Sequence, residues 1–243
     1  MFGELGARGV TVLFASGNNG VSYHVPTPTT VPQRTWPNLD HANLQDQPEP
    51  HICRLDNKRF VPVFPASCPY VTSVGGTNFV DPEVGASDST GGFSEYFPRP
   101  DWQANAVKSY LDTLGTHWSG LYNFNGRDCP DIAAQIQNYS IYNSLLPMAI
   151  SGTSASAPTV AGIVGLVNSA VIDAGKSPLG FMNSFLYSVG HRGFQDIVIG
   201  SSKGCGEKFS STGWDTAEGW VPVTGFRTPD FQKLLSIAMQ QQA

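Results

Sequence analysis

Apolar residues in this chain fall into a few short runs, separated by stretches rich in glycine, proline and small polar residues. Residues 1–8 read as the end of a helix. The β-branched run 9–16 is closed by Gly-Asn-Asn-Gly at 17–20, which predicts a buried parallel strand followed by a turn. Residues 70–75 predict a second buried strand. The stretch 93–96 predicts a further sheet element or a loop.

Helical patterns dominate the second half. Residues 101–114 have some helical character, and residues 183–188 predict a short helix. The uncharged run after Ser154 predicts a long helix to about Ala174, because Gly175-Lys176-Ser177-Pro178 supplies a glycine and then a proline to end it. Strands and helices in this order indicate a loop-rich α/β protein.

Residues 21–52 differ from the rest of the chain. They are rich in proline and show no periodicity, which predicts a long loop or insertion. A solvated surface loop is the favoured interpretation, with an interaction motif as the alternative.

Composition excludes several classes of protein. A chain of 243 residues predicts one domain with a substantial core. The net charge of −5, with only 14% charged residues, provides no basic stripe for nucleic acid. No run approaches 18 apolar residues, so we expect no membrane span, and the first residues lack the pattern of a signal peptide.

The four cysteines are too few for a disulfide framework, but they would allow one or two bridges. Cys53 and Cys68 flank a short segment that leads into a predicted strand, and they are the favoured pair. Four unpaired thiols in a reducing compartment are the alternative.

The strongest chemical signal is Ser151-Gly152-Thr153-Ser154-Ala155-Ser156-Ala157-Pro158. It places Ser154 among small residues at the start of a buried helix, where free N–H groups and the helix dipole favour developing negative charge. Acyl transfer needs such a hydroxyl, with donors aimed at the oxyanion. An isolated serine here would be interpreted as a helix cap, but the whole string favours a nucleophile. Asn18 lies where a strand ends in a turn, the place where site residues of α/β sheets gather.

This string resembles the nucleophile motif of the subtilase clan, and in detail that of sedolisins, the serine-carboxyl peptidases that include tripeptidyl-peptidases. Residues 64–77, 91–100, 130–134 and 222–231 are also similar to sedolisins. The resemblance covers most of the chain outside 21–50. It implies a subtilisin-like three-layer fold, with a mainly parallel sheet flanked by helices, and residues 1–243 as the N-terminally truncated, C-terminal part of the catalytic domain. It also implies secretion or a lysosome-like compartment.

The resemblance implies a glutamate base that is oriented by an aspartate one helical turn away, N-terminal to the strand at 9–16. This chain has only Glu4 there, without a carboxylate partner at helical spacing. We therefore expect the base pair to come from a missing N-terminal segment of the same catalytic domain. Asp131 matches a recurring family position and is interpreted as structural. None of the histidines lies in a triad context: His24, His41, His51, His117 and His191.

Asn18 departs from the family pattern, which has an aspartate at this position. A protonated aspartic acid can donate a hydrogen bond to the oxyanion only at low pH, whereas an asparagine donates at every pH. Asn18 is therefore a competent oxyanion donor, with a simple turn residue as the alternative.

The resemblance also implies one calcium ion, bound within residues 194–231. Asp196 and Ile197 match the first ligand element. In the second element, Gly219-Trp220-Val221, valine replaces the family aspartate and offers no side-chain oxygen for calcium. Asp215 repeats the Gly-Trp-Asp pattern six residues earlier and could substitute. Because Arg227 also replaces a family glycine, we expect weak or absent calcium binding.

Two functions remain open. In the first, the chain is part of a peptidase that cleaves peptide or protein substrates through an acyl-enzyme on Ser154, as a tripeptidyl-peptidase or an endopeptidase. In the second, it is a truncated or decayed family member without catalytic activity. For residues 1–243 alone we expect no useful peptide hydrolysis, marginal stability and an exposed apolar surface.

Overall fold

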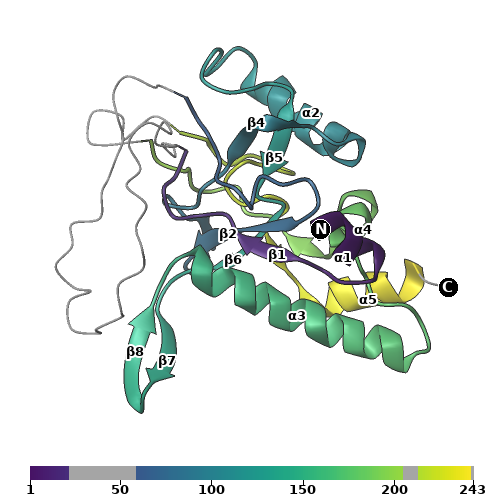
Figure 1. Ribbon diagram of the computed structural model, residues 1–243. Coiled ribbons are helices and arrows are strands. Elements are labelled where there is room, and N and C mark those ends of the chain that lie inside the picture. The colour runs from purple at the N-terminus through teal and green to yellow at the C-terminus, as the bar shows by residue number, and fades with distance from the viewer. Residues whose placement is uncertain (22–58, 205–212, 242–243) are drawn as a thin grey trace.

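Three parallel strands form the centre of the computed structural model, which describes residues 1–21, 59–204 and 213–241. Strand β2 (Thr72–Asn78) lies between β1 (Leu13–Ala15) and β6 (Ile132–Gln135) (Figure 1). The short β3 (Val84–Gly85) runs antiparallel to the end of β2. All residues of β2 except its last are buried, as expected for a strand covered on both faces. The strands predicted at 9–16 and 70–75 are present and pair in parallel, but β1 is shorter than its predicted range and is half-buried, not buried, and β2 extends to Asn78.

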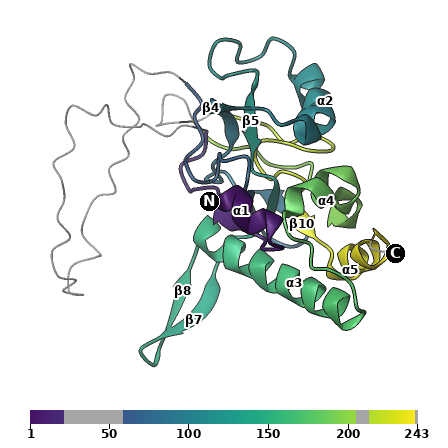
Figure 2. The same ribbon diagram turned by 45° about the vertical axis from the view of Figure 1, so that its right-hand side comes forward.

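Helix α3 (Thr153–Asp173) covers one face of this sheet and contacts all three parallel strands (Figure 2). Its bounds confirm the long helix predicted after Ser154. Helices α1 (Phe2–Ala7), α4 (Met182–Ser188) and α5 (Phe231–Gln241) complete this side. The core between sheet and helices consists of apolar residues: Val74, Ile132, Ala134, Val160, Val164, Met182 and Leu186.

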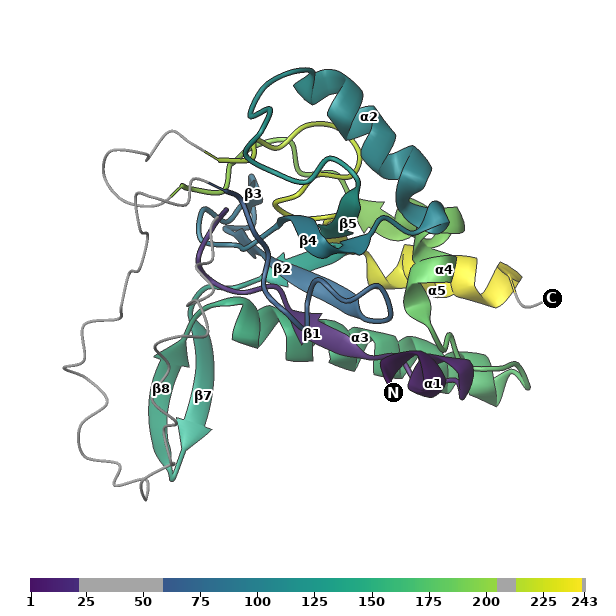
Figure 3. The same ribbon diagram turned by 45° about the horizontal axis from the view of Figure 1, so that its top comes forward.

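The other face carries a layer built around aromatic side chains. Strands β4 (Gly92–Pro98) and β5 (Gly126–Cys129) pair antiparallel, and α2 (Ala104–Leu114) follows the short 3-10 helix η2 (Asp101–Gln103) above them (Figure 3). The centre of this layer is fully buried and includes Phe93, Tyr110, Trp214, Trp220 and Val221. The predicted α/β fold, with three layers around a mainly parallel sheet, is confirmed.

Several elements had no counterpart in the sequence predictions. Strands β7 (Tyr139–Asn143) and β8 (Leu146–Ile150) form a hairpin that projects from the body next to the start of α3 (Figure 1). Near the C-terminus, the 3-10 helix η3 (Gly190–Gly193) leads into β9 (Phe194–Gln195), which pairs with β10 (Thr228–Pro229). This pairing brings the two ends of the predicted calcium region together.

Helix α3 is apolar on nearly all sides, but only one side of it is covered. It is the one helix of the described residues that is long and apolar enough to cross a membrane, which the sequence analysis did not anticipate. Core helices pass the same test, and α3 packs on the sheet. Leu166 is nevertheless 61% exposed and Ile172 53% exposed. The chain therefore presents an apolar helix face to solvent, as expected.

Apart from Val21, the proline-rich stretch 21–52 lies outside the described residues. So do Cys53, Cys205 and three of the histidines, and the predicted Cys53–Cys68 pair cannot be placed in the structure.

Candidate active site

Ser154 is the second residue of α3 and is exposed at the end of the sheet where β1 terminates. Residues in the first turn of a helix have backbone N–H groups without an intrahelical acceptor, so the Ser154 N–H is available to a ligand. The hydroxyl and the N–H of one residue thus lie at the positive end of a helix of 21 residues. This is the environment that the sequence predicts for an acyl-transfer nucleophile.

The side chain of Asn18 is fixed against this helix end. Its Oδ1 accepts hydrogen bonds from the Thr153 N–H at 2.8 Å and from the Thr153 hydroxyl at 2.9 Å. The amide orientation is defined by these contacts, because a backbone N–H can only donate. Asn18 Oδ1 therefore caps α3, and its Nδ2 group remains as a donor without an acceptor among the described residues.

Thr153 connects the turn to the helix and was not identified from the sequence as a site residue. It is buried, and its hydroxyl oxygen accepts the Gly17 N–H at 3.1 Å while donating to Asn18. The Gly-Thr-Ser motif contained the signal, but spacing alone does not show that the threonine side chain faces the turn at 17–20. Thr153 is a positioning residue.

Gly152 is required by the same contact. It adopts φ +112°, and a Cβ atom at this residue would lie 2.7 Å from Asn18 Nδ2. Only glycine fits both the backbone conformation and the close approach of the amide.

The turn that carries Asn18 is held from its far side by Thr90. The Thr90 hydroxyl accepts the Asn19 N–H at 2.8 Å, and the Thr90 N–H donates to Gly17 O at 2.9 Å. The turn is thus held from two other segments, by Thr90 on one side and by Thr153 on the other.

The described residues place no base beside Ser154. Glu4 is exposed on α1 and pairs with the N-terminal amine. His117 packs against Trp118, and His191 Nδ1 lies 3.3 Å from Leu186 O. That the base lies outside the described residues stays a prediction.

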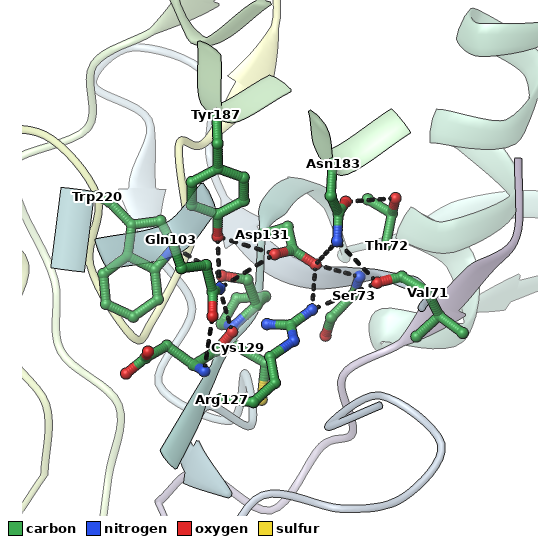
Figure 4. Close-up of polar contacts among 12 residues, drawn as sticks. Val71, Thr72, Ser73, Gln103, Arg127, Cys129, Asp131, Asn183, Tyr187 and Trp220 are labelled. Carbon is green, nitrogen blue, oxygen red and sulfur yellow. Dashed lines mark hydrogen bonds and ion pairs between the residues drawn. The ribbon is translucent and has the colours of Figure 1, made fainter. Parts of the chain in front are cut away.

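Asp131 belongs to a buried polar network, not to this site (Figure 4). Its Oδ2 accepts the Ser73 N–H at 2.7 Å and the Arg127 Nη2–H at 2.6 Å, and its Oδ1 accepts the Tyr187 hydroxyl at 2.8 Å. Asn183 donates at 3.4 Å to the same carboxylate. The carboxylate thus connects β2, β5 and α4, which supports its structural interpretation.

Burial controls the ionisation of this network. Burial alone would lower the pKa of Arg127, but the adjacent Asp131 carboxylate raises it by more than burial lowers it. The pKa of Arg127 is therefore above its usual value. Burial also raises the pKa of Tyr187 well above its usual value. Next to this pair, burial raises the pKa of Asp128 to about 7, although Arg99 opposes the shift with an ion pair at 2.7 Å.

Most of the predicted calcium ligands are engaged in other contacts. The half-exposed Asp196 forms an ion pair with the buried Arg227, Ile197 is buried, and Gly219 is exposed with φ +82°. Val221 packs in the aromatic layer, while the backbone of Asp215 forms an isolated antiparallel β-bridge with Ser201. No cluster of three or more His, Cys, Asp or Glu side chains suited to a metal occurs in the described ranges. These residues do not fit a calcium ion.

With this geometry in hand, comparison with known proteins identifies the family. The model of the subtilase family matches residues 4–178, which is more than half of the chain. This chain belongs to the subtilase family.

Among curated proteins, this subtilase is 43% identical to Tripeptidyl-peptidase SED2 of Arthroderma otae over 98% of its length. It is 41% identical to Probable tripeptidyl-peptidase SED3 of Arthroderma benhamiae over 100% of its length. The chain spans 37% and 38% of the lengths of these two relatives.

Among solved structures, the subtilase chain resembles a Pseudomonas sedolisin, described as a serine-carboxyl proteinase complexed with two molecules of pseudo-iodotyrostatin. The TM-score is 0.66 at 22% identity, covering 100% of this chain and 59% of that chain. At this identity the likeness shows the fold alone, and it confirms the subtilisin-like fold that the resemblance implied.

Proposed function

We propose that this chain supplies the nucleophile and the oxyanion donors of a serine peptidase of the sedolisin type. Ser154 is the nucleophile, and Asn18 Nδ2 is the oxyanion donor. The observation that carries the proposal is the pair of hydrogen bonds from Thr153 to Asn18 Oδ1 at 2.8 and 2.9 Å, because they leave Nδ2 as the free end of a fixed amide.

In the proposed reaction, Ser154 Oγ attacks the carbonyl carbon of a peptide bond and its proton passes to the base. The tetrahedral intermediate places a negative oxygen where Asn18 Nδ2 and the Ser154 N–H can donate to it. Such donors are worth about 10²–10³ in rate each. Collapse expels the amine, which takes the proton back from the base, and water then hydrolyses the acyl-enzyme.

The base is proposed to come from a chain segment other than the described residues. The relatives, named as tripeptidyl-peptidases, are more than twice as long as this chain and leave room for such a segment. Their names support peptides or proteins as substrates, with release of tripeptides as the proposed specificity. The resemblance to sedolisins also supports secretion of the protein.

The test is labelling of Ser154 by a fluorophosphonate, with and without the N-terminal part of the catalytic domain of Tripeptidyl-peptidase SED2 of Arthroderma otae added in trans. We expect labelling only when both parts are present, and none in Ser154→Ala. Asn18→Ala should lower the labelling rate about 10²–10³-fold. Asn19→Ala, the exposed neighbouring asparagine, is the matched control and should label at the wild-type rate.

Three results would contradict the proposal in whole or in part. Labelling that persists in Ser154→Ala would show that another residue reacts. A folded complex of the two parts that never labels would favour the non-catalytic family member. Labelling of the 243-residue chain alone, lost in Ser154→Ala, would support the nucleophile and refute an external base.

A further inference from the structure

Arg227 places a buried positive charge in the region where the resemblance to sedolisins implies calcium. Its side chain is fully buried. The guanidinium forms an ion pair through Nη1 with Asp196 Oδ1, and its Nη2 donates to the backbone oxygen of Ala217. One cation therefore binds one carboxylate and one carbonyl oxygen, which are two of the ligand types that calcium uses in proteins.

The backbone of Arg227 is fixed on both sides. Its N–H donates to Thr224 O at 2.9 Å, and its carbonyl oxygen accepts the Ala133 N–H of β6 at 3.0 Å. The residue adopts φ +82°, a conformation that is unfavourable for residues other than glycine. The resemblance to sedolisins also implies a glycine at this position, which is the residue that this backbone conformation favours.

A single arginine is enough to balance the carboxylate charge that remains in this region. A calcium ion carries two charges and is balanced by two carboxylates, whereas a guanidinium carries one. Of the two aspartates implied by the family pattern, this chain retains Asp196 and has Val221 in place of the other. Val221 is fully buried and packs in the aromatic layer. Asp215 is exposed, and its backbone oxygen accepts a hydrogen bond from the Tyr110 hydroxyl at 3.4 Å.

We propose that the Arg227 guanidinium is a built-in substitute for the calcium ion of the family, which makes the C-terminal loop of this chain independent of metal. On this proposal, the replacement of the family aspartate by Val221 and that of the family glycine by Arg227 are coupled. The first replacement removes one negative charge, and the second adds a positive charge that takes the place of the calcium ion.

The charge is present throughout the physiological range. A guanidinium is effectively always protonated in proteins, so Arg227 keeps its charge at neutral and acidic pH. The inference does not depend on Ser154 and holds whether or not the protein is a peptidase.

The test compares thermal unfolding of the 243-residue chain in calcium with unfolding in EDTA, together with terbium luminescence as a direct measure of binding at a calcium site. For the wild type we expect the same Tm in both solutions and no saturable terbium signal. The double variant Val221→Asp/Arg227→Gly should gain a saturable signal, and calcium should raise its Tm by several degrees.

Single variants separate the charge from the metal. Arg227→Met keeps the length of the side chain and should lower Tm in both solutions, without rescue by calcium. Lys108→Met is the matched control, because Lys108 is exposed on α2 and pairs only with Asp112 one turn away. It should leave Tm nearly unchanged.

The proposal is overturned if calcium raises the Tm of the wild type, or if terbium binds it in a manner abolished by Asp196→Asn. It is also overturned if Arg227→Met lowers Tm no more than Lys108→Met. Because the wild type alone decides the first outcome, the test stands even if the double variant does not fold.

Discussion

The contact between Thr153 and the turn at 17–20 can be tested with an isosteric change. Thr153→Val keeps the shape and the β-branch of the side chain but removes the hydroxyl. The backbone N–H of Thr153 still donates to Asn18 at 2.8 Å, so the variant breaks only the contacts that the hydroxyl makes.

The magnitude follows from the two hydrogen bonds that are lost. The hydroxyl donates to Asn18 Oδ1 at 2.9 Å and accepts the Gly17 N–H at 3.1 Å. Asn18 is exposed and keeps its hydrogen bond from the Thr153 N–H, so losing the bond from the hydroxyl changes the free energy of unfolding only slightly. The Gly17 N–H is left unpaired beside the buried Thr153, and an unsatisfied donor of this kind costs about 1–3 kcal/mol.

Urea unfolding followed by tryptophan fluorescence measures this loss. Thr113→Val is the matched control, since the Thr113 hydroxyl donates at 3.2 Å to Ser109 O on the exposed side of α2. We expect the control to change the free energy of unfolding by less than about 0.5 kcal/mol. Equal effects of the two variants would show that the Thr153 hydroxyl does not hold the turn in place.

Three further changes test other parts of the structure. Gly152→Ala should cost about 1–3 kcal/mol in urea unfolding because its Cβ would meet Asn18 Nδ2 at φ +112°, whereas Gly162→Ala, on an open side of α3, should be neutral or stabilising. Since the pKa of Asp128 is about 7 in the folded chain and about 3.9 when unfolded, the native state binds more protons between these values. The free energy of unfolding should therefore fall by roughly 2–4 kcal/mol as the pH rises from 4 to 7. Asp128→Asn should flatten this pH dependence. If the variant keeps the same pH dependence, another group causes it. Leu166 lies on the exposed apolar face of α3, so we expect copies of the chain to associate through this face and Leu166→Lys to reduce that association in sedimentation velocity; a monomeric wild type would contradict this expectation.

The sequence was informative where apolar pattern and stop signals coincide. Helix α3 was predicted to within a residue or two because an uncharged run ends in glycine and proline. Strand β2 was predicted because it lies in a short run with β-branched residues that is buried in the sheet, whereas β1 (Leu-Phe-Ala) is half-buried and was located by the apolar run that ends in the Gly-Asn-Asn-Gly turn. In these segments local preference and tertiary packing demand the same structure.

The hairpin of β7 and β8 carried no such signal. Most of its residues are exposed or half-buried on both faces, so apolar and polar positions do not alternate. Its turn uses Ser144 at φ +50° and Leu145 at φ +71°, where hairpins favour Asn-Gly. Helix α5 is a different case. Asp230 Oδ1 accepts the Lys233 N–H at 3.1 Å, so Asp230 is a helix-capping residue that marks the start of α5 in the sequence.

The contacts of the candidate site depend on long-range closure. Asn18 and Thr153 are 135 residues apart, and the sequence indicated a shared site only through the resemblance to sedolisins. The pairing of Asp196 with Arg227 depends on the β9–β10 bridge, which pairs Gln195 with Thr228. Neither strand is longer than two residues, too short to be recognised by its pattern.

The two departures from the family pattern share a physical feature that bears on whether the site has decayed. Loss of constraint would leave groups without partners, such as an unpaired Asp196 carboxylate or an uncapped α3. Instead, Arg227 pairs with Asp196 through Nη1, although its buried Nε has no partner among the described residues, and Asn18 Oδ1 accepts the Thr153 N–H at the start of α3. Each replacement also removes a dependence on solution conditions. An amide donates at every pH where a carboxylic acid must be protonated, and a covalently attached guanidinium cannot dissociate as a metal ion does. Compensated changes of this kind are expected of a site whose geometry is maintained, and they favour the peptidase over the decayed relative.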